Sequence, residues 1–154
     1  DLAANDAHAL SNTFALEKYH NWTGLCIEPN DHYWKSLIYG RKCTIVGAVV
    51  ADTVNAEVPV AFRGFNGGIV SEETDNKRGG TDSRKTTTFS HILDKFDVPK
   101  VIDYLSLDVE GAEELVMSSF PFDEYTISVL TVERPTVALK HKLRDNGYWN
   151  KMQW

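Results

Sequence analysis

The sequence predicts an α/β fold with a doubly wound, mostly parallel sheet. Two observations support this class: apolar runs bounded by turn residues recur at intervals that suit strands, and helical patterns fill the segments between them. The predicted strands are 24–28, 43–50, 101–109 and 126–133. The predicted helices are 8–19, 31–39, 88–96, 111–119 and 136–146. Because strands that alternate with helices need crossover connections, neighbouring strands are expected to run parallel.

The run at 101–109 is the clearest strand signal. It is rich in Val, Ile and Leu with few polar breaks, which is typical of a strand buried on both faces. Residues 31–39 place their apolar side chains on one face of a helix, as core packing requires. The short run at 58–62 follows a polar stretch, so a minor edge strand is predicted there. Residues 63–87 are rich in glycine and charge and predict a long loop or insertion, either a lid over a ligand or a solvated excursion.

Length and composition are those of one packed domain spanning residues 1–154. Hydrophobic residues make up 42% of the chain and charged residues 25%. The net charge of -6 argues against a nucleic-acid surface, which would present a basic face, so a small molecule or a neutral glycan is the expected partner. No stretch approaches the ~18 consecutive apolar residues of a membrane span, and no targeting segment is visible in this chain. The compartment therefore stays open.

The cysteines, the histidines and one short motif carry weaker signals. Cys26 and Cys43 lack the spacing of a zinc site or a redox motif, so both are predicted to be free thiols packed in the core. The histidines show neither metal-ligand spacing nor the context of a catalytic nucleophile, and no metal is predicted. The stretch Asn21-Trp22-Thr23 formally matches a glycosylation acceptor, a pattern that also arises often by chance.

The first candidate ligand site is a bend of small residues directly after Asp1. Ligands of doubly wound sheets bind beyond the carboxyl ends of the strands. In the stretch "AANDA", residues 3–7, small side chains let backbone amides approach a ligand, and the start of the following helix favours an anion. The structural alternative is a tight turn in which Asn5 or Asp6 caps that helix.

Glu28 ends the first predicted strand, about twenty residues after the bend. An ionised carboxylate only accepts hydrogen bonds, so it can pair with both hydroxyl groups of a ribose. A small-residue turn followed at this spacing by an acid is typical of a site for an adenosine-containing ligand.

Further acids end the later strands. Asp108 and Glu110 lie two residues apart in "LSLDVEGAEE", so an extended backbone points both to the same side, toward the ligand crevice. Glu133 ends the last predicted strand. The structural alternatives are that Glu110 or Glu113 favours the positive end of the next helix, and that Glu133 forms an ion pair with Arg134.

Six stretches of the chain resemble one known family. In order they are "DLAANDA", "SNTFALEK", "GLCIEPN", "IDYLSLDVEGAE", "FPFDEY" and "LTVE", and together they span nearly the whole sequence. They resemble the FkbM family of S-adenosylmethionine-dependent methyltransferases. The resemblance implies a class I, Rossmann-like methyltransferase fold and methyl transfer commonly to a hydroxyl oxygen of a sugar or similar metabolite.

The resemblance also implies roles for individual residues. The cofactor-binding residues would be Asp1, Ala3, Asn5, Asp6, Glu28, Pro29 and Asp108. Glu110 would lie beside cofactor and acceptor. A hydroxyl acceptor also needs a base, and the candidates are Asp108, Glu110, Glu133 and His8, which directly follows the bend.

The chain departs from the family pattern in two respects. The usual opening turn is Gly-Ala-Asn-Asp-Gly, whereas Ala3 and Ala7 stand here in place of the glycines. Alanine in a left-handed backbone conformation costs about 1 kcal/mol. The strand before Asp1 would be the central one, and its neighbours would expose unpaired edges without it. We therefore expect this first central strand to be missing or truncated, and the 154 residues to be part of a longer chain.

Two other functions suit some of the same residues. An NAD-dependent oxidoreductase would use Glu28 equally well for its ribose, but the bend lacks the G-x-G-x-x-G that lets the backbone meet a pyrophosphate. A non-catalytic subunit would use the fold to bind a protein assembly partner, and Ala3, Ala7 and the exposed-looking insertion at 63–87 favour this alternative.

Overall fold

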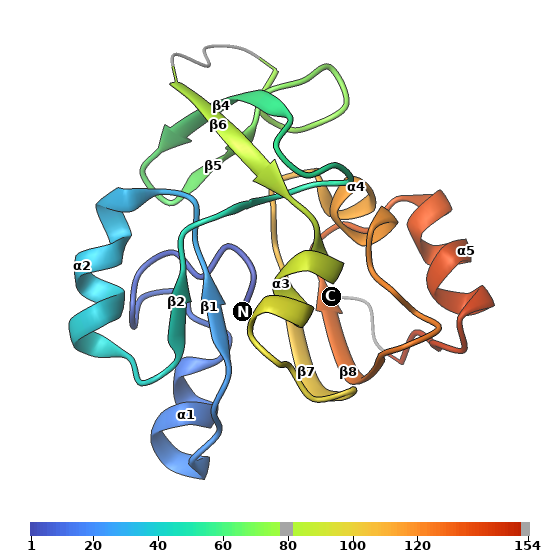
Figure 1. Cartoon of the computed structure of the whole chain (residues 1–154), viewed down its shortest axis with the longest axis horizontal. Coiled ribbons are helices and arrows are strands. Elements are labelled where there is room, and N and C mark those ends of the chain that lie inside the picture. The colour runs from blue at the N-terminus through green and yellow to red at the C-terminus, as the bar shows by residue number, and fades with distance from the viewer. Residues whose placement is uncertain (78–81, 152–154) are drawn as a thin grey trace.

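The computed structural model describes residues 1–77 and 82–151 and shows a mixed α/β architecture (Figure 1). The elements in chain order are α1 (Phe14–His20), β1 (Leu25–Ile27), α2 (Asp31–Gly40), β2 (Thr44–Val46), β3 (Val49–Val50), β4 (Glu57–Arg63), β5 (Asn66–Ile69), β6 (Asp82–Thr87), α3 (Phe89–Lys95), β7 (Val101–Leu107), α4 (Glu113–Ser118), β8 (Thr126–Val132) and α5 (Val137–Asp145). Within the described ranges, no helix is both long and apolar enough to span a membrane.

Two parallel strand pairs lie side by side at the centre of the molecule. β1 pairs with β2 and β7 pairs with β8, in both cases in parallel, as the crossover argument predicts. Leu2 joins the pairs, because it forms parallel bridges to both Ile27 and Leu107. The Leu2 N–H donates to the carbonyl of Ser106 at 2.9 Å, and the Ile27 N–H donates to the carbonyl of Asp1 at 2.8 Å. The first two residues thus occupy the place expected for the central strand and connect the two parallel pairs through single bridges. The other described strands form a four-stranded sheet of mixed direction, in the order β3-β6-β4-β5, so one continuous doubly wound sheet is not seen.

The predicted loop at 63–87 contains two strands, β5 and β6, which form a mostly antiparallel β-structure with β4. β4 pairs antiparallel with both β5 and β6, and β6 pairs in parallel with the short β3. A strand is present at 58–62 as predicted, but it is not an edge strand, since β4 lies between β6 and β5. The polar sequence of β6 alternates only weakly in burial, which explains why the sequence gives no strand signal there. Residues 78–81 of the predicted loop lie outside the described residues.

Most predicted helices match the structure to within two residues, and the exception is the first. The predicted helix 8–19 begins only at Phe14. The Oγ of Ser11 accepts hydrogen bonds from the N–H groups of Thr13 and Phe14. These two N–H groups at the start of α1 therefore have a partner, and the helix begins there. The predicted strand 43–50 is likewise divided into β2 and β3.

The main hydrophobic core fixes the ends of the parallel strands. Leu2, Ile27 and Leu107 pack there with Val116 and Met117 of α4. All five side chains are buried, so the residues that follow these strands are held in defined positions.

The two cysteines form a disulfide, which corrects the prediction of free thiols. Cys26 lies on β1 and Cys43 directly precedes β2, and their Cα atoms are 5.9 Å apart. This distance is within the range that a disulfide spans. The two cysteines are 17 residues apart in the sequence, and the sequence does not show their pairing because it depends on the register between β1 and β2.

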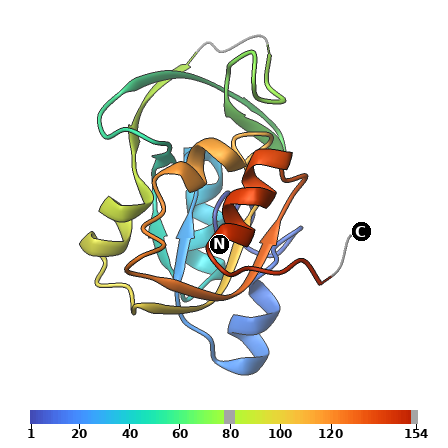
Figure 2. The same cartoon turned by 90° about the vertical axis from the view of Figure 1, so that its right-hand side faces the viewer.

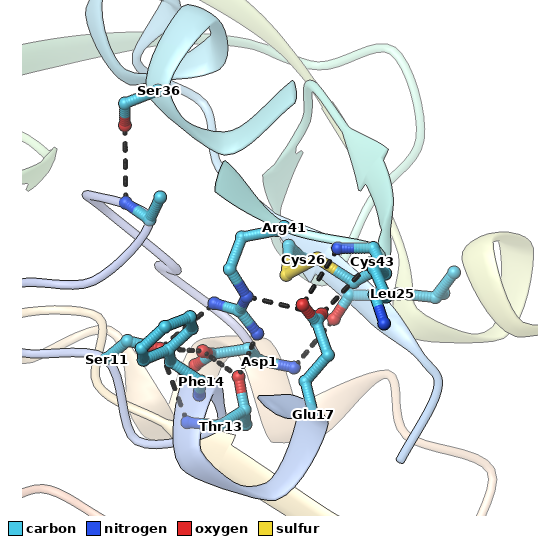
Figure 3. A network of polar contacts seen from close by, with 12 residues as sticks. Asp1, Ser11, Thr13, Phe14, Glu17, Leu25, Cys26, Ser36, Arg41 and Cys43 are labelled. Carbon is cyan, nitrogen blue, oxygen red and sulfur yellow. Dashed lines mark hydrogen bonds and ion pairs between the residues drawn. A yellow bond between two sulfur atoms is a disulfide. The ribbon is translucent and has the colours of Figure 1, made fainter. Parts of the chain in front are cut away.

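A buried polar network supports the start of the chain (Figure 3). The Nε of Arg41 lies 3.3 Å from a carboxylate oxygen of Glu17, and both groups are almost fully buried. Glu17 also accepts the backbone N–H groups of Lys42 and Cys43. The Nη2 of Arg41 donates to the hydroxyl of Thr13 at 2.8 Å, and that hydroxyl donates to the carboxylate of Asp1 at 2.6 Å.

Candidate active site

A cavity of about 230 Å³ lies where β1 and β7 end, beneath the β4–β5 hairpin. In both views the antiparallel β-structure lies over the carboxyl ends of the parallel strands, and α1 lies at the opposite end of the molecule (Figures 1 and 2). Eight of the predicted site residues line the cavity: Asp1, Ala3, Asn5, Glu28, Pro29, Asp108, Glu110 and Glu133. Asp6 and His8 do not line it.

The bend after Asp1 has the backbone conformation of a glycine turn. Ala3 has φ 60° and Asn5 has φ 55°, so both are left-handed. Ala3 therefore carries the strain of about 1 kcal/mol expected for an alanine in this region. Ala7 is not left-handed, so the second replacement of a family glycine carries no such strain.

Asp6 stabilises the bend from outside the cavity. One of its carboxylate oxygens accepts the N–H groups of His8 and Ala9, each at 3.0 Å, and the other accepts the hydroxyl of Ser36 at 3.0 Å. The hydrogen bonds from Ala9 and His8 hold the pKa of Asp6 below its usual value. The tight turn raised as the alternative is thus present, but Asp6 holds this turn and caps no helix, because α1 begins only at Phe14 with Thr13 as its N-cap.

His8 does not line the cavity. Its ring packs edge-on against Phe14 with centroids 4.4 Å apart, and an added Cβ at Gly40 would lie 3.0 Å from it. His8 was predicted as a possible base, but it is not at the cavity wall where the ligand would bind. The chain turns at residues 6–13 instead of continuing as a helix beside the cavity.

Glu28 connects the bend to the cavity wall. Its Oε2 accepts the N–H of Asn5 at 2.8 Å, and its Oε1 accepts the N–H of Asn30 at 2.7 Å. The residue is only 5% exposed and forms no ion pair with any described residue. Burial raises the pKa of Glu28, while the two backbone hydrogen bonds oppose that rise. Since each carboxylate oxygen can accept a second hydrogen bond, the group keeps acceptor capacity for a ligand.

The β4–β5 hairpin forms the roof of the cavity, and the sequence did not predict it. The hydroxyl of Tyr33 donates to the carbonyl of Gly64 at 2.6 Å, and the side-chain amide of Asn5 donates to the carbonyl of Phe65 at 2.8 Å. The rings of Tyr33 and Phe65 stack with centroids 6.4 Å apart. Gly64 has φ 63°, which suits a residue without a Cβ at the hairpin tip.

Asn5 also leaves an acceptor unused. Its Oδ1 is buried without a hydrogen-bond partner among the described residues. Because Asn5 lines the cavity, this oxygen is available to a ligand donor, and an unpaired buried acceptor is otherwise costly.

Three carboxylates lie close together at the cavity wall, and two of them, Asp108 and Glu133, line the cavity. Oxygens of Asp108, Glu113 and Glu133 lie within 4.8 Å of one another. Glu113 is buried, and its Oε1 accepts the N–H groups of Val109 and Gly111, so it shapes the turn that carries Glu110. Among the described residues these three side chains are the group that could hold a metal ion.

The charges of this group are divided unequally. Burial, together with a hydrogen bond to Glu133 and repulsion from it, raises the pKa of Asp108 to about 7. Burial also works against ionisation of Glu133, but hydrogen bonds from Arg134 and Asp108 outweigh it and lower the pKa of Glu133. Near neutral pH, Asp108 therefore both accepts and releases a proton readily, while Glu133 stays charged.

Arg134 neutralises part of this acidic group. Its Nη2 lies 2.8 Å from Asp75, 2.9 Å from Glu133 and 3.3 Å from Glu110. The ion pair that was the alternative reading of Glu133 is thus formed, although Glu133 still lines the cavity. Burial, followed by the charge of Glu133, raises the pKa of Glu110.

The sequence model of the Methyltransferase FkbM domain matches residues 1–148. The chain belongs to the FkbM methyltransferase family. No curated protein and no solved structure matches it. Membership of the FkbM family favours a methyltransferase over an NAD-dependent oxidoreductase.

Proposed function

We propose that this FkbM domain binds S-adenosylmethionine in the cavity and transfers its methyl group to a hydroxyl-bearing acceptor. The observation that supports the proposal is the position of Glu28, whose carboxylate holds the bend through Asn5 and lines the cavity at the same time. A ribose in the cavity would place its two hydroxyl groups against the acceptor positions that Glu28 leaves open.

An apolar recess adjoins the cavity and offers contacts to one edge of a nucleobase. A second hollow of about 40 Å³ shares Ala3, Pro29 and Gly67 with the main cavity. Its other walls are largely aliphatic and include Ala48 and Val49. An adenine attached to a ribose at Glu28 would direct its apolar edge into this recess.

The polar side of the cavity suits the cationic end of the cofactor. S-adenosylmethionine carries a positive sulfonium and an ammonium group, and both are favoured electrostatically by the carboxylates of Asp1, Glu133 and Glu110 along the wall. The ammonium group also offers donors for the unpaired Oδ1 of Asn5.

The proposed reaction is an in-line displacement. Bound S-adenosylmethionine would supply an electrophilic methyl group: the acceptor oxygen would bond to the methyl carbon while the methyl–sulfur bond breaks with its electron pair on sulfur, which would leave S-adenosylhomocysteine. The proton of the hydroxyl group passes to Asp108, whose pKa of about 7 suits a base near neutral pH. Positioning of the two reactants would supply about 7–11 kcal/mol of the rate acceleration.

A sugar or another small hydroxyl compound is the acceptor class that the walls favour. Carboxylates at Glu110 and Glu133 would accept hydrogen bonds from sugar hydroxyl groups, and the half-exposed ring of Phe65 at the roof would pack on the apolar face of a sugar ring.

Calorimetric titration with S-adenosylhomocysteine, S-adenosylmethionine and NAD tests the proposal. We expect saturable binding of the first two ligands and none of NAD. Tight NAD binding would instead favour the oxidoreductase. Absence of binding by all three would favour the non-catalytic subunit, for which the strained Ala3 is the supporting observation.

A further inference from the structure

The stretch Asn21-Trp22-Thr23 has no part in the cavity, yet the structure presents it as an acceptor. We propose that Asn21 carries an N-linked glycan and that the protein acquires it in an oxidising, secretory compartment. The inference goes beyond the methyltransferase function and does not depend on it.

The acceptor stretch is open to a modifying enzyme. All three residues are exposed and lie in the link between α1 and β1. Asn21 ends α1 with a left-handed backbone at φ 56°, and its side chain makes no hydrogen bond to any described residue. Thr23, the residue that completes the acceptor pattern, is likewise unengaged within the described ranges.

The location of Asn21 leaves the candidate active site free. The link at 21–24 precedes β1, whereas the cavity residue Glu28 follows it. α1 lies at the end of the molecule opposite the β4–β5 roof in both views (Figures 1 and 2). A glycan at Asn21 would therefore extend away from the cavity.

The disulfide supplies the second, independent observation. Cys26 and Cys43 are the only cysteines of the chain, and they are joined. Disulfides of this kind form and persist in oxidising compartments and are rare in the cytosol. N-linked glycans are also added in the secretory pathway. An exposed acceptor in a disulfide-bonded chain therefore meets the glycosylating enzyme, whereas a chance match in a cytosolic protein does not.

Two exposed aromatic rings beside Asn21 would be covered by a glycan at this position. Tyr19 is 68% exposed and Trp22 is 40% exposed, and both flank the acceptor in sequence. The apolar faces of the first sugars would pack on these rings and shield them from unwanted association.

The modification is a simple group transfer. The side-chain amide nitrogen of Asn21 attacks the anomeric carbon of an oligosaccharide carried on a lipid diphosphate. The bond between that carbon and the diphosphate oxygen breaks, the lipid diphosphate leaves with the electron pair, and the amide loses one proton to the transferase.

One peptide pair reports both the glycan and the disulfide. Trypsin cuts after lysine and arginine, so peptide 19–35 contains Asn21 and Cys26, and peptide 43–63 contains Cys43. The full chain is expressed behind a cleavable leader in glycosylating eukaryotic cells, denatured and digested without reduction. The linked pair is then weighed before and after treatment with peptide-N-glycosidase, which converts a glycosylated asparagine to aspartate.

Matched variants isolate the acceptor pattern. Thr23→Ala destroys the pattern and Thr23→Ser keeps it, and neither removes a hydrogen bond among the described residues. We expect the linked pair to carry a glycan in the wild type and in Thr23→Ser, and to be unmodified but still cross-linked in Thr23→Ala.

Two results would overturn the proposal. One is a cross-linked peptide pair from the secreted wild type with an unmodified Asn21. The other is free thiol at Cys26 in the secreted protein, which removes the argument from the compartment. If the chain is not secreted, translation into rough microsomes yields the same peptide pair and the same decision.

Discussion

Replacing Glu28 by glutamine alters the chemistry of the proposed ribose site while keeping the size of the side chain. The carboxylate accepts one backbone N–H on each oxygen, from Asn5 at 2.8 Å and from Asn30 at 2.7 Å. A glutamine amide has a single acceptor oxygen, so one of these two N–H groups must lose its partner.

The substitution changes two quantities that can be measured separately, the free energy of unfolding and the Kd. A buried donor without a partner costs about 1–3 kcal/mol, which is the expected fall in the free energy of unfolding of the free protein. The ribose loses a hydrogen bond to a charged group, worth about 1.5–3 kcal/mol, so the Kd for S-adenosylhomocysteine should rise about 10- to 150-fold.

Calorimetry measures the Kd, and urea unfolding of the free protein measures the stability. The matched control is Asp6→Asn, because Asp6 holds the same bend by its hydrogen bonds to His8 and Ala9 but does not line the cavity. We expect the control to lose stability while its Kd changes by no more than about threefold.

Two outcomes would refute the reasoning. If Glu28→Gln loses stability but keeps its Kd, the carboxylate supports the bend and does not contact the ligand. If Asp6→Asn weakens binding as strongly as Glu28→Gln, the loss reflects distortion of the bend in both variants.

Further predictions follow from other groups. Because Asp108 must be deprotonated to act as a base, kcat/KM should rise with pH through about 7, and Asp108→Asn should remove this rise and lower kcat by about 10²–10⁴-fold; an unchanged pH profile would exclude Asp108. The raised pKa in the folded state also means that the contribution of Asp108 to stability falls between about pH 4 and pH 7, so urea unfolding of Asp108→Asn should show a weaker loss of stability over that range. Cys26→Ser should lower the free energy of unfolding by about 3 kcal/mol, measured by urea denaturation, and reductant should then have no further effect. Arg41→Ala leaves Glu17 buried without its cation and should lower the same free energy by about 3–5 kcal/mol; a loss below ~1 kcal/mol would show that the pair behaves as a surface pair. Tyr33→Phe removes a hydrogen bond to the roof and should raise the dissociation rate of S-adenosylhomocysteine about 2- to 10-fold in stopped flow, whereas an unchanged rate would show that this bond does not retain the ligand.

The sequence was sufficient to predict residues that follow strands, because local patterns place strand ends well. Glu28, Asp108 and Glu133 were expected at one edge of a parallel arrangement, and all three line the same cavity. The argument needs only the strand assignments and the rule that parallel strands end at a common edge.

Contacts that depend on strand register were not predictable. The Cys26–Cys43 disulfide joins neighbouring strands, and the burial of each cysteine as an apolar residue matched the free-thiol interpretation equally well. The polar strand β6 pairs with β3 and β4, and this pairing outweighs the weak strand propensity of its own residues.

The roof of the cavity was missed for the same reason. From the sequence, Tyr33 is predicted only as an aromatic residue on the apolar face of α2. Nothing in the neighbouring sequence predicts its hydrogen bond to Gly64, 31 residues away. For Asp6 and His8 the error was local: the side chain of Asp6 accepts nearby N–H groups, so the chain turns before α1 and His8 packs on Phe14.

Asn5 belongs at once to the floor and to the roof of the cavity. Its backbone N–H binds Glu28, and its side-chain amide binds the carbonyl of Phe65. A cofactor that orders the floor at Asn5 should therefore also favour closure of the hairpin, and by thermodynamic reciprocity a closed hairpin should tighten the grip on the cofactor to the same degree. A single asparagine would in this way couple ligand binding to closure of the hairpin.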